Sequence, residues 1–210
     1  GTENEVKVNV KSIHSEYLDK ENINKELIDL DGIIVAPGFG QRGLDGKILA
    51  VEYARVNKIP FLGICLGMQM AVIEYARNVK KMRYANSTEI SEKCKDPVID
   101  LMTSQKEIIN KGGTMRLGAW DCEILKNTIS NKIYSKKVVS ERHRHRYEFN
   151  DEYSKKIFDE NFIVAGKNPE TNLVEIVENK DHPWFVGVQF HPEYKSSVYN
   201  PHPIFVNFVK

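Results

Sequence analysis

The sequence has 210 residues, of which 41% are hydrophobic and 28% charged, and its formal net charge is +1. That length suits one domain with one core, and the near-neutral charge gives no electrostatic reason to expect nucleic acid or a membrane surface as a partner. Cys65, Cys94 and Cys122 form neither an even disulfide set nor a C-x-x-C pair, which is typical of reduced thiols. No apolar run approaches the roughly 20 residues of a membrane span. We therefore expect a cytoplasmic protein.

Strands and helices alternate in the first third of the predicted structure. Period-two alternation predicts a strand, a short apolar run closed by Pro and Gly predicts a buried parallel strand, and apolar residues at helical spacing predict a helix. The strands are expected at 6–13, 31–40 and 59–64, and the helix at 45–58. The last two strands and the helix form a βαβ unit, so the loop at Gly38 and the turn at Cys65 should meet at the carboxyl ends of parallel strands. Ligands bind there in α/β proteins.

The later part of the chain is richer in predicted strands. Residues between Cys94 and Gly118 contain Pro97, Gly112 and Gly113 and predict loop with short strands. No repeat or linker interrupts the sequence, which favours a single compact unit. Further strands are expected at 142–150, 162–166, 173–178 and 184–190, and a closing helix at 203–210.

Cys65 lies in "GICLG", where a buried strand meets a helical pattern. A sharp strand-to-helix turn exposes a nucleophile and needs small residues two positions before and after it, here Gly63 and Gly67. The positive end of the following helix should favour the thiolate. A buried structural cysteine is the alternative, because free cysteine behaves as a small hydrophobic residue.

His191 is the best candidate for the base that a cysteine nucleophile needs. It follows the predicted strand 184–190 in "HPE", where Glu193 can hydrogen-bond the second imidazole nitrogen. Together with Cys65 these residues predict a Cys-His-Glu triad. By itself "HPE" would indicate only a strand end followed by a turn.

Three arginines alternate in "ERHRHRYE", so Arg142, Arg144 and Arg146 share one face of an extended strand. Arginine suits a carboxylate because its guanidinium can donate two parallel hydrogen bonds. The flanking glutamates and the near-zero net charge weigh against a nucleic-acid patch. For Arg142 and Arg144 a solvated or salt-bridged edge strand remains an equal alternative.

These motifs resemble class I glutamine amidotransferases, in which a Cys-His-Glu triad hydrolyses the side-chain amide of glutamine. The resemblance rests first on "PFLGICLGMQ" and "VQFHPE". It narrows to the glutaminase domain of CTP synthases over about Asp31 to Phe208, through "GFGQRGLDGKILAVEYAR", "AVIEYARNV", "ANSTE", "GGTMRLG", "ERHRHRYEFN" and "HPWFVGVQFHPE". It implies an α/β, flavodoxin-like amidotransferase fold, with a central, mostly parallel sheet flanked by helices and additional antiparallel strands.

The resemblance also assigns roles to residues. It makes Cys65 the nucleophile, His191 the base and Glu193 its orienting partner. Glu89 would meet the substrate ammonium and Arg146 its α-carboxylate, and the backbone N–H of Leu66 is an expected oxyanion donor. The remaining glutamine-binding groups are expected to be the backbone of Gly38, Leu66, Gly67 and Met68 and the side chain of Gln69.

Two departures from the family pattern stand out. The family loop reads P-G-G-F-G, whereas Pro37 occupies the second position here. Proline has no N–H, so Gly38 becomes the expected second oxyanion donor. The family domain also opens with a strand and a helix that residues 1–210 are expected to lack.

The resemblance implies partners and cofactors as well. The synthase domain, expected outside these 210 residues, would use ammonia, ATP, Mg and UTP to make CTP, with GTP as a candidate activator and a homo-oligomer as the full-length form. No cofactor or metal is expected in the glutaminase domain. The alternatives are another class I amidotransferase, a γ-glutamyl hydrolase, or a non-catalytic regulatory module on the same fold.

Overall fold

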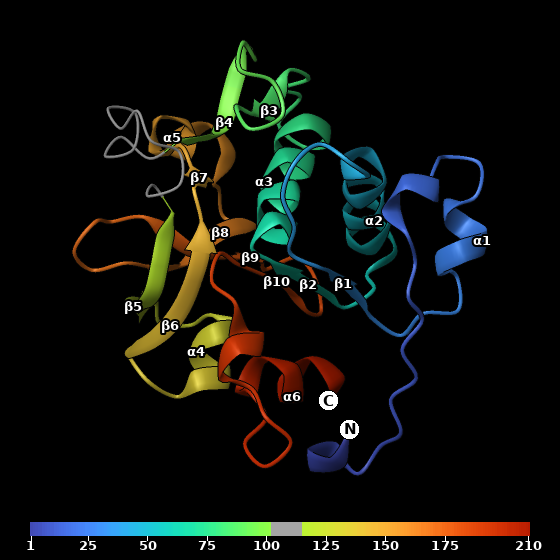
Figure 1. The fold of residues 1–210 in the computed structure, drawn as a ribbon, viewed down its shortest axis with the longest axis vertical. Coiled ribbons are helices and arrows are strands. Elements are labelled where there is room, and N and C mark those ends of the chain that lie inside the picture. Colours follow the sequence, from blue (N-terminus) through green and yellow to red (C-terminus); the bar gives the residue numbers. More distant parts are fainter. Residues whose placement is uncertain (102–114) are drawn as a thin grey trace.

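A mixed β-sheet forms the centre of the computed structural model, which describes residues 1–101 and 115–210 (Figure 1). Within these ranges seven strands follow the order β1-β2-β10-β9-β8-β5-β6, and a smaller sheet has the order β3-β4-β7. The strands of the large sheet are β1 (Ile33–Val35), β2 (Phe61–Ile64), β5 (Arg116–Ile124), β6 (Val138–His145), β8 (Phe162–Lys167), β9 (Val174–Asn179) and β10 (Phe185–Val188). Those of the small sheet are β3 (Ala85–Ser87), β4 (Asp96–Leu101) and β7 (Tyr147–Phe149).

Helices cover both faces of the large sheet, α2 and α3 on one side and α4 and α6 on the other (Figure 1). The helices are α1 (Ile23–Leu27), α2 (Leu44–Asn57), α3 (Leu66–Asn78), α4 (Ile129–Tyr134), α5 (Ser154–Ile157) and α6 (Pro203–Val209). Short 3-10 turns are formed by Thr2–Asn4, Ser15–Tyr17, Asp151–Tyr153 and Pro192–Lys195. The arrangement is the layered α/β architecture that the sequence predicted.

The predicted βαβ unit is confirmed. β1 and β2 pair in parallel, with Ile34 opposite Leu62, and α2 connects them. β10 joins β2 in parallel on the other side, whereas the four pairings from β10 to β6 are antiparallel. The parallel part is thus three strands wide, and antiparallel pairing makes up more of the sheet than expected.

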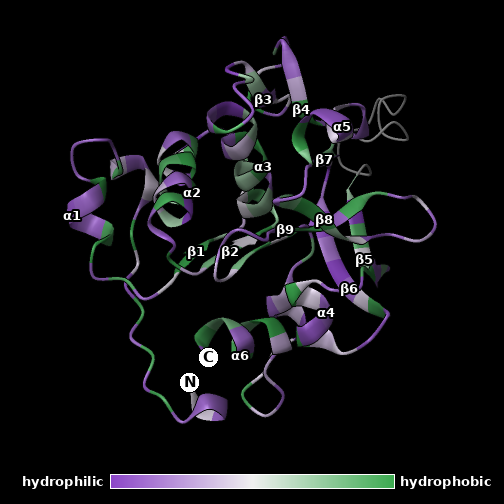
Figure 2. Cartoon of the chain, turned by 180° about the vertical axis from the view of Figure 1, so that it is seen from behind, coloured by the Kyte–Doolittle hydropathy of each residue, from purple (hydrophilic) through white to green (hydrophobic). Residues whose placement is uncertain are grey.

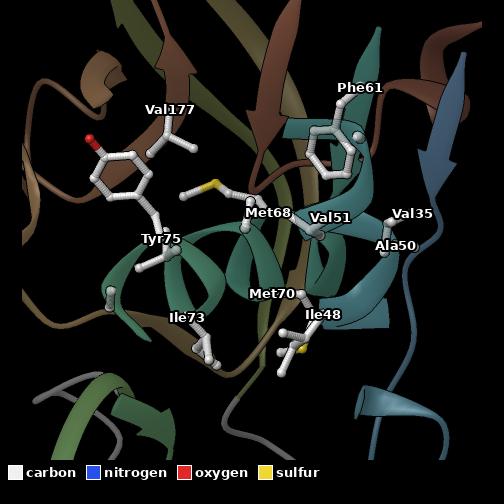
Figure 3. Close-up of a cluster of buried hydrophobic side chains, with 14 of the residues drawn as sticks. Val35, Ile48, Ala50, Val51, Phe61, Met68, Met70, Ile73, Tyr75 and Val177 are labelled. Carbon is white, nitrogen blue, oxygen red and sulfur yellow. The ribbon is translucent and has the colours of Figure 1, made fainter. Parts of the chain in front are cut away.

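Alternate residues of the central strands enter opposite layers of the core. Phe61 and Phe185 pack towards α2 and α3, whereas Leu62 and Val186 pack towards α6. Figure 3 shows the side chain of Met68 extending from α3 towards Val177 of β9. Because both faces are covered, β2 and β10 have no exposed residue and their sequences are continuously apolar.

One predicted strand is wrong. Residues 6–13 are extended but form no strand pairing among the residues that the structure describes. Val6, Val8 and Val10 are 48%, 47% and 85% exposed. Alternation marks a half-buried strand only where a neighbouring strand and a core face exist. Here no neighbouring strand is present in the described part of the chain, and of the apolar residues only Ile13 packs against the core.

The later predictions are confirmed with one refinement. The expected strand 142–150 is divided into β6 and β7, because the chain bends at Arg146. β6 is hydrophilic along much of its length in Figure 2, as its arginines and histidines require. In the stretch predicted as loop and short strands, β4 and the start of β5 are present, while Gly112 and Gly113 lie outside the described residues.

The turn from β2 into α3 depends on two glycines. A Cβ on Gly67 would lie 2.1 Å from the Val35 carbonyl oxygen, and one on Gly63 would lie 2.7 Å from the Gly67 backbone. Neither space can be made by moving a flexible side chain. The spacing G-x-C-x-G is therefore a requirement of backbone packing.

We expect Gly67→Ala to lower the free energy of unfolding by about 1–3 kcal/mol, because the added methyl group forces the backbones of β1 and α3 apart. Gly38→Ala is the matched control, since its Cβ would meet the Leu66 side chain at an ordinary 3.4 Å. We expect it to change stability by less than about 1 kcal/mol. Urea unfolding measures both, and equal effects would contradict the packing argument.

Candidate active site

Cys65 occupies the turn between β2 and α3 in a strained backbone conformation, with φ 52° and ψ −104°. Its N–H donates to the Val188 carbonyl oxygen at 2.7 Å, which ties the turn to the end of β10. A positive φ in a residue with a side chain is costly and is found where the surroundings impose it. The predicted elbow is present.

The Cys65 thiol is buried, and burial raises its pKa to about 12. A hydrogen bond from the Leu66 N–H lowers the pKa, Glu193 and Glu89 raise it, and Lys47 lowers it. The expectation that the helix terminus favours the thiolate is correct in direction, but desolvation outweighs it. The resting group is therefore a thiol that needs a base.

His191 and Glu193 form the expected pair. His191 Nδ1 lies 2.6 Å from Glu193 Oε1, and the imidazole stacks on Tyr194 with centroids 4.8 Å apart. The backbone N–H of His191 donates to the Arg142 carbonyl oxygen at 2.8 Å. Within the described residues His191 Nε2 is buried and has no hydrogen-bond partner. The carboxylate fixes Nδ1 as the protonated nitrogen, so Nε2 is left to accept a proton.

A small pocket opens beside the thiol. Its lining consists of Gly38, Phe39, Cys65, Gln69, Glu89, Met115, His145, Arg146 and Tyr147. Five residues predicted for the nucleophile and the glutamine site therefore meet here, from four separate parts of the chain. Leu66, Gly67 and Met68 begin α3 behind the thiol and do not line the pocket; the Met68 side chain is fully buried in the core.

Opposite charges project into this pocket. Glu89 Oε1 accepts the Gly40 N–H at 3.0 Å, which holds the carboxylate next to the loop that contains Gly38. Arg146, at the bend between β6 and β7, has a buried Nε with no hydrogen-bond partner among the described residues. Arg142 and Arg144 are exposed on β6, and the Arg144 guanidinium lies 5.8 Å from the ring centroid of Phe39, which lines the pocket. Arg146 differs from both in its buried Nε, which has no hydrogen-bond partner among the described residues.

Gln69 and Gln189 link the pocket wall to the thiol. Gln69 Nε2 donates to the Tyr147 carbonyl oxygen at 2.9 Å and to Gln189 Oε1 at 3.2 Å. Gln189 Nε2 donates to Cys65 Sγ at 3.7 Å. Sequence reasoning assigned no role to Gln189, although its place directly before Phe190 and His191 in "VQFHPE" was the available signal.

Behind the pocket, five buried side chains form a closed ring. Arg116 lies 3.6 Å from Glu148 and 2.7 Å from Glu175. His145 Nδ1 lies 3.6 Å from Glu148, His143 Nε2 lies 3.5 Å from Glu175, and His143 Nδ1 is 2.9 Å from His145 Nε2. All five are at most 5% exposed. We call this set the buried ring.

Burial keeps the buried ring close to neutral. It raises the pKa of Glu148 to about 8 and that of Glu175 to about 7, while Arg116 acts in the opposite direction. It lowers the pKa of His143 to about 2 and that of His145 to about 3. Glu175 lies closer to Arg116 than Glu148 does and has the lower pKa, so we infer that Glu175 is the ionised carboxylate and that Glu148 holds the proton.

These shifts predict the pH dependence of stability. Folded Glu148 keeps a proton between about pH 4.5 and 8 that the unfolded chain releases, so stability falls as pH rises through this range. The buried histidines act oppositely: the unfolded chain binds protons below about pH 6.5 that His143 and His145 do not, so stability falls as pH decreases. Above pH 6.5 the histidine effect has ended, and the raised pKa of Glu148 makes stability fall as the pH rises towards about 8.

We therefore expect Glu148→Gln to reduce the loss of stability between pH 6.5 and 8.5, measured by urea unfolding at both pH values. Glutamine keeps the shape of the side chain but cannot titrate. Glu160→Gln, a change of an exposed carboxylate, should leave the loss as it is in the original protein. The same loss in the Glu148→Gln variant would show that this group does not titrate in the range.

The described residues hold no group of His, Cys, Asp or Glu side chains suited to a metal ion. None of the helices in the described ranges is both long enough and apolar enough to cross a membrane.

Comparison with known proteins identifies the family. Residues 1–210 match the family glutamine amidotransferase class-I, and the chain belongs to it. It is 60% identical to a CTP synthase of Christiangramia forsetii over 210 residues and 58% identical to one of Clostridium acetobutylicum. In each case the match covers 100% of this chain but only 38% and 39% of the relative, so the chain spans less than half the length of these relatives.

A solved structure extends this result to the fold. The structure described as "Trypanosoma brucei CTPS - glutaminase domain with bound acivicin" superposes with a TM-score of 0.91 at 39% identity, covering 99% of this chain and 81% of that one. A glutamine amidotransferase of Thermotoga maritima shares the fold at 17% identity, with a TM-score of 0.52, over 80% of this chain and 58% of that one. The predicted amidotransferase fold class is confirmed.

Proposed function

We propose that this chain is the glutaminase domain of a CTP synthase. It would hydrolyse L-glutamine to glutamate and ammonia, and a synthase domain would use that ammonia to aminate UTP. The observation that carries the proposal is the pocket that combines a buried thiol, a carboxylate and an arginine whose Nε has no hydrogen-bond partner among the described residues. The 39% identity with the Trypanosoma brucei domain supports it.

The charges of the pocket suit glutamine. Free glutamine is a zwitterion whose reacting amide is neutral, so one anion and one bidentate cation are enough to orient it. We assign the substrate ammonium to Glu89 and the α-carboxylate to Arg146, whose Nε has no protein partner among the described residues. The amide carbon would then lie near Cys65 Sγ. Gln69 would support the Tyr147 backbone at the wall of the site.

The proposed reaction begins with proton transfer. His191 Nε2 takes the proton of Cys65, and the thiolate attacks the amide carbon of glutamine to form a tetrahedral oxyanion. When the carbon–nitrogen bond breaks, His191 returns the proton to the leaving nitrogen and ammonia departs. Water, deprotonated by His191, then attacks the thioester carbon, which releases glutamate and restores the thiol. Glu193 orients the imidazole throughout.

Two backbone amides are assigned to the oxyanion. Leu66 N–H, which already points at the Cys65 sulfur, is one. Gly38, whose loop lies beside the Leu66 side chain, is the other. Pro37 supplies no N–H, so the peptide between Ala36 and Pro37 cannot donate to the oxyanion.

The wider assignments follow from the relatives. We propose the synthase domain as the partner of this chain, with ATP, Mg and UTP bound there and GTP as activator. A homo-oligomer and a cytoplasmic location belong to the same proposal. The glutaminase chemistry itself requires only the protein groups described above.

The function is tested in the full-length enzyme, with glutamine labelled with 15N at its amide. We expect 15N to appear in the amino group of CTP and glutamate to be released in step. Cys65→Ala should lower both by about a thousandfold or more, because the nucleophile is lost, while synthesis from added ammonia continues. Cys94→Ala is the control and should keep both activities.

A covalent probe checks the same residue. Acivicin should modify Cys65 and leave Cys94 and Cys122 unmodified, as read by mass spectrometry. Modification of another cysteine with Cys65 untouched, or glutamate release that survives Cys65→Ala, would refute the proposed function.

The role of Arg146 is tested by Arg146→Lys. The substitution keeps the charge but loses the two-pronged geometry, so we expect glutamine binding to weaken by about 1.5–3 kcal/mol, seen mainly as a higher KM for glutamine. Arg142→Lys, at an exposed position of β6, the strand that leads to Arg146, is the matched control and should leave KM unchanged. An unchanged KM in both variants would assign the carboxylate to another group.

A further inference from the structure

Lys47 reaches from the first turn of α2 to the loop that precedes this helix. Its Nζ donates to the Ala36 carbonyl oxygen at 2.8 Å. The same nitrogen lies 3.8 Å from the position that a Cβ on Gly38 would occupy. A positive charge is thus fixed directly behind the residue proposed as the second oxyanion donor. The side chain is half-buried, which makes such a charge more effective than on the surface.

The bond from Lys47 holds a peptide group that lacks a hydrogen-bond donor because of Pro37. The carbonyl of Ala36 belongs to the peptide that joins it to Pro37, and proline has no N–H through which that peptide could be held. Lys47 holds the other side of the peptide group. With the proline ring fixing φ, this bond restricts the direction in which the next residue, Gly38, presents its own N–H.

The charges around Cys65 also give Lys47 a part in the site. Glu193 and Glu89 both raise the pKa of the thiol, so they oppose its ionisation. The positive charge of Lys47 lowers it, and the thiolate in turn raises the pKa of Lys47 against the effect of burial. The two groups therefore stabilise each other when both are charged.

We propose that Lys47 is a positioning residue of the glutaminase site: through its bond to Ala36 it orients Gly38, and through its charge it favours the Cys65 thiolate. The inference rests on the proposed function for its catalytic meaning. Its physical content, a lysine that holds the Ala36 peptide and contributes a positive charge near one buried thiol, can be measured without turnover.

Three variants separate the two effects. Lys47→Arg keeps the charge and the donor, Lys47→Gln keeps a donor for the Ala36 carbonyl but removes the charge, and Lys47→Met removes both. Lys126→Met, a change at an exposed lysine far along the sequence, is the control. The rate of Cys65 alkylation by iodoacetamide is followed against pH in the full-length enzyme by mass spectrometry, and kcat and KM for glutamine are measured alongside.

We expect Lys47→Gln and Lys47→Met to raise the apparent pKa of Cys65 and so to slow its alkylation at neutral pH by about twofold or more. Lys47→Arg and Lys126→Met should alkylate as the original protein does. In turnover, Lys47→Met should lower kcat further than Lys47→Gln because it also frees the Ala36 peptide, while KM changes little in either.

Unchanged alkylation in the Gln and Met variants, or failure of Lys47→Arg to restore it, would overturn the inference. Either result would leave the proposed function intact so long as Cys65→Ala still abolishes glutamate release. Conversely, glutamate release that survives Cys65→Ala would refute the proposed function, whatever the alkylation rates show.

Discussion

The backbone contact between Gly67 and Val35 is the constraint on which the site depends. With no side chain on Gly67, the start of α3 lies against the end of β1, and Gly63 allows β2 to turn sharply beneath it. The residue at the top of this turn is forced to a positive φ. Cys65 therefore points its sulfur towards the ends of the parallel strands, where the loop after β1 and the end of β10 also arrive. Other parts of the site are arranged around a sulfur atom that this contact has already placed.

Burial is the second organising effect, and it favours the neutral form of the titratable groups on both sides of the pocket. On one side it keeps Cys65 protonated, which protects a reactive group until substrate and base are in place. On the other side it holds the buried ring near neutrality, so that His145, which lines the pocket, brings no positive charge to it. Arg146 consequently supplies the positive charge at that wall, which is the role that the proposed function assigns to it.

Local sequence patterns predicted the parts of this structure that local packing determines. The glycine spacing around Cys65 led to the elbow, because the steric requirement involves residues two positions away. The alternation at 6–13 failed, because no pattern within a segment reveals whether a neighbouring strand exists. The arginine series "RHRHR" placed all three arginines on one face, whereas the bend at Arg146 turns one of them inward. Glu89 was found only through family resemblance, since nothing in its neighbourhood links it to the distant bend between β6 and β7.

Gln189 and Lys47 were missed for a related reason. Each acts through a contact made across the fold, Gln189 with Cys65 and Lys47 with the Ala36 carbonyl. A glutamine in a buried strand and a lysine in the first turn of a helix are both ordinary in isolation. Gln189 reaches Cys65 because the sheet order places β10 beside β2. Lys47 reaches Ala36 because the loop after β1 lies next to the start of α2.

The end of β10 has a mechanical consequence. Three successive groups of the site extend from it: the Val188 carbonyl holds the Cys65 backbone, the Gln189 side chain reaches the sulfur, and His191 follows two residues further on. Both partners of the proposed proton transfer are thus attached to the end of one strand, Cys65 through its backbone N–H and His191 through the chain itself. The Gly38 loop is held from elsewhere, by Lys47 of α2 and by Glu89. The proposed proton-transfer pair and the proposed oxyanion donor at Gly38 therefore depend on different parts of the fold.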